Sequence, residues 1–129
     1  MAVRLGGVRV SGNVTRDALR FPGAARREVA AMRMETAREA LAQGRCLEVR
    51  YDDYARVVEV HACGFTGQGH AVMRVWQVRG GSVSGERTGW KLLRLDEALA
   101  LAVTGEASEA PRRGYRRGDA GMARIVAQV

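Results

Sequence analysis

The hydrophobic period of this 129-residue chain changes at Gly44, and that change constrains the fold more than any other feature. Over residues 26–43, apolar and small residues recur every three to four positions, which predicts a helix with one buried face. After Gly44, apolar and polar residues alternate with a period of two, which predicts β-strands. Glycine at this junction suits a left-handed cap at the helix end. The sequence therefore predicts one helix followed by a β-rich body.

The part of the chain after the helix divides into strands separated by turns about ten residues apart. The predicted strands span residues 46–52, 56–62, 71–79 and 88–95. Residues 96–104 are compatible with a helical turn or a fifth strand, and 122–129 with a last helix or strand after a loop-like stretch over 105–117. Short strands with tight turns favour a meander that curls into a small barrel. We therefore predict a mainly β fold with α, a bent antiparallel β-barrel with one N-terminal packed helix.

Strand alternation also predicts which side chains face the core. In the second strand, we expect Val58, Val60 and Ala62 on one face, alternating against Arg56 and Glu59. The two charged residues are thereby predicted to lie away from the core.

The chain is expected to form one domain. Residues 1–24 combine glycines and arginines with a short Val/Leu alternation, which predicts a basic N-terminal arm or an edge strand. Residues 25–129 are expected to hold the single core, because a chain of this length has little room for another. Without a signal peptide or an apolar run of about 18 residues, we expect a cytoplasmic protein that does not contact membranes. Cys46 and Cys63 are expected to be reduced core thiols.

Charge is the composition feature that bears on function. Lys and Arg total 21 against 14 Asp and Glu, a net charge of +7, and Lys91 is the single lysine. The resulting isoelectric point near 10.6 indicates an anionic partner, such as nucleic acid or a nucleotide.

Metal binding and catalysis find little support in the residue spacing. His61, Cys63 and His70 are soft ligands, but they lack the paired spacing of zinc sites. Cys63, His61 and Asp53 can be named as a nucleophilic trio, but no sequence signature of a known catalytic motif accompanies them. We therefore expect no metal, no cofactor and no enzymatic activity.

Basic and aromatic residues alternate within two of the predicted strands. Arg74 and Trp76 share one face of the third strand, and Trp90 and Arg94 share one face of the fourth. Guanidinium groups beside indole rings can pair with phosphates and stack on bases. The alternative is that both tryptophans fill the core while the arginines point outward or pair with Glu59 and Asp96.

Two segments resemble WYL domains. The run from Leu47 to Tyr51, followed by Arg56 to His61, is similar to their opening hairpin, and Trp90–Asp96 is similar to the run that closes their core. The likeness covers about residues 33–104, and compact WYL-like bacterial proteins continue into a tail similar to residues 111–115. The resemblance implies an Sm-like (SH3-type) β-barrel, and a ligand-sensing or nucleic-acid-binding role in transcription regulation or phage defence. It also implies that basic strand residues, here Lys91 and Arg94 with Arg74 as neighbour, contact single-stranded nucleic acid.

The chain departs from the WYL pattern at three points. The Trp-Tyr-Leu triplet that names the family falls at Ala71-Val72-Met73, and Glu97 stands where a second arginine is expected. The residues ahead of the predicted barrel are too few for the winged-helix domain of WYL regulators.

We therefore expect a non-catalytic module that binds nucleic acid or nucleotide-like anions. The alternative is a barrel for protein interaction or homo-oligomer assembly through edge strands, without a nucleic-acid ligand. The predicted contact residues are Tyr51, Arg74, Trp76, Trp90, Lys91 and Arg94.

Overall fold

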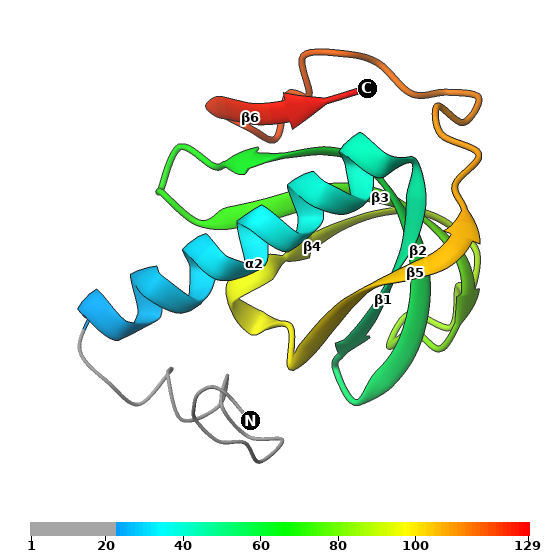
Figure 1. Ribbon diagram of the computed structural model, residues 1–129, viewed down its shortest axis with the longest axis horizontal. Helices are drawn as coiled ribbons and strands as arrows, with labels where there is room; N and C mark the ends of the chain where they lie inside the picture. The colour runs from blue at the N-terminus through cyan, green and yellow to red at the C-terminus, as the bar shows by residue number, and fades with distance from the viewer. Residues whose placement is uncertain (1–22) are drawn as a thin grey trace.

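A computed structural model describes residues 23–129 as one helix against a mainly β body (Figure 1). The elements are α2 (Gly23–Gln43), β1 (Arg45–Tyr51), β2 (Tyr54–Phe65), β3 (Ala71–Gly80), β4 (Gly89–Arg94), the short 3₁₀ helix η1 (Leu95–Glu97), β5 (Ala100–Ala107) and β6 (Arg124–Gln128). The basic arm predicted for residues 1–24 lies outside the described residues, except for the first two positions of α2.

All six strands belong to one antiparallel sheet, in which β1 to β4 form the predicted meander. The strand order is β4-β3-β2-β1-β5, and β6 pairs with β2. β2 is long enough to hold two neighbours on the same side. Its first half pairs with β1 and its second half, from Ala62 to Phe65, pairs with β6. No pairing joins β4 to β5 in the described part of the chain, so the sheet is bent but not closed.

The main core lies between α2 and one face of the sheet. The helix contributes Met34, Ala37 and Ala40, which recur every three residues. The sheet contributes apolar side chains from β1 to β4, among them Leu47, Val58, Val60, Met73, Val75 and Leu93. No helix in the described range is long and apolar enough to cross a bilayer.

The local signals of the sequence mark the observed boundaries well. Gly44 has a φ of 64°, the left-handed conformation predicted for the helix cap. Asp52 and Asp53 form the β1–β2 turn with φ of 50° and 66°, which aspartate tolerates better than most residues. Segment 96–104, predicted as a helical turn or a strand, includes both: η1 ends in it and β5 begins in it. The last segment is a strand, β6.

Both charged residues of β2 are buried, although the sequence placed them away from the core. Arg56 and Glu59 are buried, with exposed fractions of 3% and 1%. Arg56 closes the end of the core by donating to the carbonyl of Tyr51 and to the side-chain oxygen of Gln77. Besides a shift between Val57 and Val58, the register shifts between Val60 and Ala62, so the alternation does not continue through the strand.

That shift moves Ala62 away from the helix side of the sheet. Val58 and Val60 belong to the main core, whereas Ala62 packs with Val72 and Met122 in a second cluster. The second cluster lies on the opposite sheet face, beneath the C-terminal segment. β2 therefore contributes side chains to both cores.

Gly64 lets β6 approach β2, and a substitution there tests this contact. A β-carbon at Gly64 would collide with the main chain of Arg124. We expect Gly64→Ala to lower the free energy of unfolding by about 1–3 kcal/mol, since the strands must move apart. Denaturant unfolding followed by tryptophan fluorescence measures this loss. Gly67→Ala is the control, because nothing lies within 4 Å of its β-carbon; equal losses in both variants would contradict the close approach.

Candidate functional site

The C-terminal tail, defined as residues 108–122, crosses the sheet face opposite α2. Hydrogen bonds fix both of its ends: the amide of Ser108 donates to the carbonyl of Gly44 (2.8 Å), and the amide of Ala123, just past the tail, donates to that of Phe65 (2.8 Å). Because β3 alternates, Val72, Arg74 and Trp76 face this tail while their neighbours face the core. The tail and these strand residues together form the candidate site.

A buried ion pair anchors the first half of the tail. The Arg112 guanidinium donates to both carboxylate oxygens of Glu59, at 2.7 and 3.1 Å, and the amide of Glu109 donates to the same carboxylate at 2.8 Å. The guanidinium also lies 5.5 Å from the centre of the Trp76 ring. Hydrogen bonding to Glu59 raises the pKa of Arg112. Each oxygen of the buried carboxylate thus has a partner, and both partners come from the tail.

His61 makes the second anchor and is held in one neutral tautomer. Its Nδ1 lies 3.0 Å from the carbonyl of Glu59, and its Nε2 lies 2.9 Å from the amide of Arg112. A carbonyl only accepts and an amide only donates, so the proton resides on Nδ1. Burial lowers the pKa of His61, in agreement with a neutral ring. The Tyr115 hydroxyl donates to the His61 carbonyl at 3.1 Å.

Four aromatic rings meet at this place. Trp76 and Trp90 are directly opposite across β3 and β4, with ring centres 5.3 Å apart and planes at 87°. Trp90 also contacts His61 edge-on at 4.7 Å. Tyr115 lies 6.2 Å from Trp90, with the planes inclined at only 30°. Edge-to-face contacts of this kind hold the Trp90 ring in place and leave part of its surface to the tail side.

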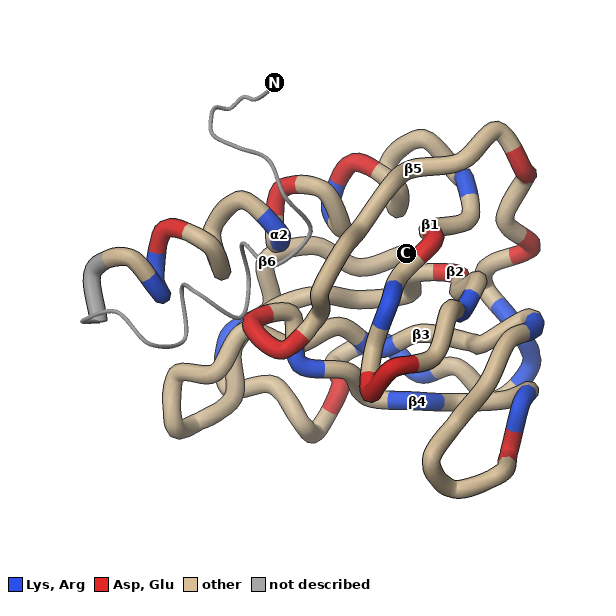
Figure 2. The backbone as a smooth tube through the Cα atoms, turned by 90° about the horizontal axis from the view of Figure 1, so that it is seen from below, with Lys and Arg blue, Asp and Glu red and all other residues tan. Residues whose placement is uncertain are grey.

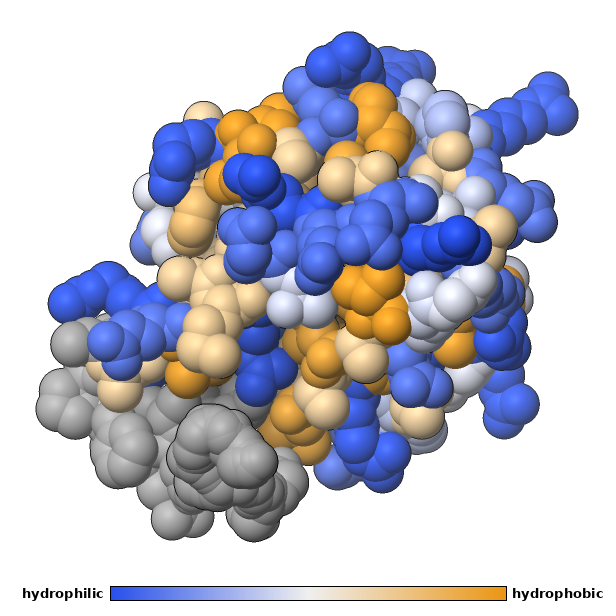
Figure 3. Space-filling view, in the orientation of Figure 1, coloured by the Kyte–Doolittle hydropathy of each residue, from blue (hydrophilic) through white to orange (hydrophobic). Residues whose placement is uncertain are grey.

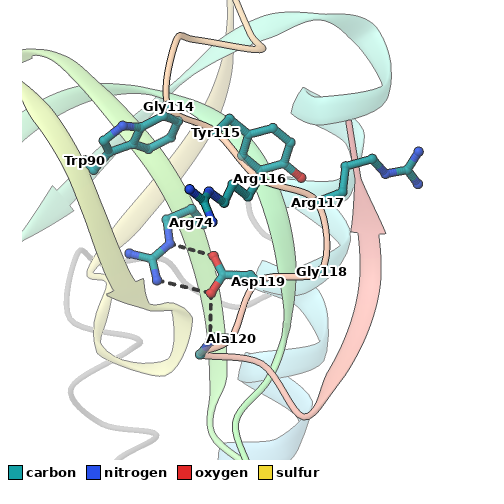
Figure 4. A pocket seen from close by; sticks show the side chains of 10 residues that line it. Arg74, Trp90, Gly114, Tyr115, Arg116, Arg117, Gly118, Asp119 and Ala120 are labelled. Carbon is teal, nitrogen blue, oxygen red and sulfur yellow. Dashed lines mark hydrogen bonds and ion pairs between the residues drawn. The ribbon is translucent and has the colours of Figure 1, made fainter.

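A surface cavity of about 570 Å³ opens beside these rings (Figure 4). Its lining comes from Arg74 on β3, Trp90 on β4 and tail residues 114–121. Arg74 donates to both carboxylate oxygens of Asp119, at 2.6 and 3.1 Å, which lowers the pKa of that carboxyl. The cavity therefore has an aromatic wall and a floor formed by a neutralised ion pair.

Free positive charge surrounds the cavity. Arg113, Arg116 and Arg117 are exposed, and none of them makes a hydrogen bond or ion pair within residues 25–129. Arg116 and Arg117 belong to the lining of the cavity. Lys and Arg positions occur on all sides of the chain in Figure 2, so net charge alone does not single out a surface. The distinguishing feature here is unpaired arginine beside half-buried aromatic rings that line a cavity.

Three of the six predicted contact residues come together at this site. Trp76 and Trp90 are half-buried cross-strand neighbours, and Arg74 lines the cavity. The alternative for the arginines holds in part: Arg94 does pair with Asp96, at 3.0 and 2.6 Å, whereas Arg74 pairs with Asp119 rather than with Glu59.

The other three predicted residues are engaged elsewhere. Tyr51 is buried, and its hydroxyl accepts from the amide of Arg94 and donates to Glu97. Burial raises the pKa of Tyr51 to about 12. Arg94 is neutralised by its carboxylate neighbours.

Lys91 faces the hairpin loop instead of the cavity. Its ammonium donates to the hydroxyls of Ser82 and Ser84, at 3.2 and 3.4 Å, and to the carbonyl of Glu86 at 2.8 Å. All three of its protons are therefore used within the loop.

The residues missed by sequence reasoning belong to the tail. Tyr115, Arg116 and Arg117 fell in the loop-like stretch over 105–117, and Asp119 lay beyond it without an assignment. The signal that marks them is the dense alternation of arginine and glycine around one tyrosine, from Pro111 to Gly118. Such a basic-aromatic cluster is typical of nucleic-acid contacts.

Groups considered for catalysis are occupied or unreactive in the structure. Both ring nitrogens of His61 are engaged in hydrogen bonds, and burial raises the pKa of the Cys63 thiol to about 11. Cys46 and Cys63 are both buried and free, as predicted. Within the described residues, no cluster of three His, Cys, Asp or Glu side chains is arranged to hold a metal ion.

Comparison of the chain with family models, with curated proteins and with solved structures finds no match.

Two adjacent arginines allow a matched test of the buried anchor. We expect Arg112→Ala to lower the free energy of unfolding by about 3–5 kcal/mol, because it leaves the Glu59 carboxylate buried without its cation. Arg113→Ala removes the same charge from an exposed position and is expected to cost less than about 0.5 kcal/mol. Urea unfolding of both variants measures the difference. Equal stabilities would show that the Glu59–Arg112 pair does not anchor the tail.

The lowered pKa of His61 makes the stability depend on pH. On acidification the unfolded chain binds a proton at this residue first, so the stabilising contribution is complete above pH of about 6.5 and decreases below it. We expect the free energy of unfolding to fall by up to about 1.4 kcal/mol per pH unit between pH 6.5 and 5. His61→Gln is expected to flatten this slope, whereas His70→Gln keeps it. Urea melts across this range compare the three proteins, and an unchanged slope in His61→Gln would contradict the assignment.

Proposed function

We propose that the chain is a non-catalytic binding module for single-stranded nucleic acid, and that the cavity beneath the tail is its contact surface. The observation that carries the proposal is the meeting of Trp90 and Tyr115 with the unpaired Arg116 and Arg117 at one cavity. Aromatic rings stack on unpaired bases of any sequence, and arginines pair with the phosphates between them. The volume of about 570 Å³ lies within the range of small-ligand pockets, so one nucleotide unit fits.

The rigidity of the site favours this function. The Trp90 ring is held by Trp76 and His61, and the tail that carries Tyr115 is anchored by the Glu59–Arg112 pair. A ring that is already ordered loses little conformational entropy when a base stacks on it. Arg74 is not an open phosphate site, because Asp119 already occupies its guanidinium. The phosphate contacts are therefore assigned to the exposed arginines of the tail.

We also infer that the sheet is an open form of the Sm-like barrel that the resemblance to WYL domains implies. The supporting features are a helix ahead of a four-stranded meander, and a fifth strand that returns to pair with β1. In this proposal, the tail and β6 are additions that cover one sheet face. A regulatory role for the bound nucleic acid extends the same resemblance.

Fluorescence anisotropy with a labelled single strand of about 15 nucleotides tests the proposed contact surface. We expect Arg116→Ala/Arg117→Ala to weaken binding by about ten-fold or more, and to lower the slope of log Kd against log salt by roughly 1–2. The control is Arg26→Ala/Arg27→Ala, which removes the same charge from consecutive exposed arginines on α2. That variant is expected to bind nearly as well as the unmodified chain.

Two results would contradict the proposal. Equal losses in both double variants would indicate diffuse attraction to a basic protein. Equal affinity for the single strand and for a duplex of the same sequence would exclude base stacking, because paired bases hide their faces.

A further inference from the structure

The outer edge of β5 is an unprotected sheet edge. β5 pairs with β1 on one side, and no strand of the described residues pairs with its other side. Exposed edges are commonly protected by charged residues, proline or bulges. The first four residues of β5, from Ala100 to Val103, include no charged residue and no proline; the register shift of the β1–β5 pairing lies beyond them, and Glu106 is bonded to Arg79. The edge is therefore available for pairing with another extended chain.

A hollow lies on each face of this edge. On the helix side, a hollow of about 200 Å³ is lined by Val29, Met32, Arg33 and Thr36 of α2 with Leu101 of β5. A second hollow, of about 220 Å³, is lined by residues of β1, β2 and β5 that include Arg50, Ala55, Ala100 and Ala102. Ala100 and Ala102 alternate with Leu101, so this second hollow lies on the other face. An added strand would direct alternate side chains into the two hollows.

Arg33 indicates that a ligand of this edge carries negative charge. Its Nε is buried without a hydrogen-bond partner, and its side chain makes no ion pair within residues 25–129. Burial lowers the pKa of Arg33 to about 10, and the charge of Asp96 opposes this shift only in part. A buried cation of this kind is stabilised by a carboxylate that arrives with a ligand. Arg50 and Glu48 are both exposed and line the second hollow, so the charge argument for an acidic ligand rests on Arg33.

We propose that the β5 edge binds an extended segment of a partner protein, which alternates apolar side chains and carries a carboxylate opposite Arg33. Main-chain hydrogen bonds to an open edge supply affinity in this mode, and pockets for alternate side chains supply specificity. The space-filling view of the face that carries α2 shows apolar patches between the hydrophilic side chains (Figure 3). Met32, which lines the first hollow, is 71% exposed and offers an adaptable apolar contact. The edge shares no residue with the tail cavity, so this proposal does not depend on nucleic-acid binding.

A second copy of the chain fits this edge less well. Two β5 strands paired with each other would bring no carboxylate to Arg33 from residues 100–105, and Glu106 is already bonded to Arg79. In such a pairing, the acidic side chain has to come from a segment other than β5. The observations therefore favour a foreign acidic and apolar peptide.

Selection from a display library of linear ten-residue peptides, with the full chain as target, tests this surface. We expect the enriched peptides to alternate apolar residues and to contain Asp or Glu. Titrated into the ¹⁵N-labelled chain, they are expected to shift the amide signals of β5 and of Val29 to Thr36. Arg33→Glu is expected to weaken their binding by about ten-fold or more, and replacing the acidic residue of the peptide with Lys is expected to restore it. Arg27→Glu, an exposed position on the same helix, is the control.

A second variant keeps the test decisive if Arg33→Glu fails to fold. Ala100→Glu places a negative charge at an exposed position of the edge opposite Arg50, where cross-strand pairing favours it. This variant is expected to fold and to lose affinity for the acidic peptides. The proposal is overturned if no peptide is enriched, if the enriched peptides lack acids, or if they shift signals elsewhere. Light scattering that finds a dimer abolished by Ala100→Glu would assign the edge to a second copy instead.

Discussion

The pairing of Glu59 with Arg112 is the interaction on which the second half of the structure depends. A carboxylate that is 1% exposed on a central strand is costly unless each of its oxygens is bonded. The tail supplies both bonds, through the Arg112 guanidinium and the Glu109 amide. Once this pair forms, the amide of Arg112 is also in place to donate to His61. The tail thus becomes part of the domain, although it contains no helix or strand of its own.

β2 makes this arrangement possible because it faces two cores. Val58, Val60 and Cys63 face the helix-side core, whereas Ala62, moved by the register shift after Val60, faces the tail-side core, so one strand supports both. Beyond the shift, β6 takes the place beside β2 that β1 has left. Trp90 is held between these layers by aromatic neighbours from β2, β3 and the tail. The candidate binding surface is therefore a product of three segments that are distant in the chain.

The sequence predicted the candidate site in part. Trp76, Trp90 and Arg74 were recognised because strand alternation places them on one face, and that alternation is local. Strand alternation did not predict that Arg94 and Lys91 are engaged by other groups of the chain. Arg94 pairs with Asp96 and Lys91 donates to the hairpin loop, and both contacts form only in the folded chain. Tyr115 and Arg116 were missed because a loop has no period from which its position can be read.

By itself, the sequence determined the helix, the four-strand meander and the turns between them. Each of these follows from residues close in the chain: the period of apolar side chains, the left-handed Gly44, and the Asp52-Asp53 turn. Tertiary structure alone decided that Arg56 and Glu59 are buried and that the tail covers the sheet. Both outcomes depend on which group pairs with a buried charge, and the partner of Glu59 is Arg112, 53 residues away in the sequence. Strand alternation assigns a side chain to a face, but only the folded chain shows whether another segment covers that face.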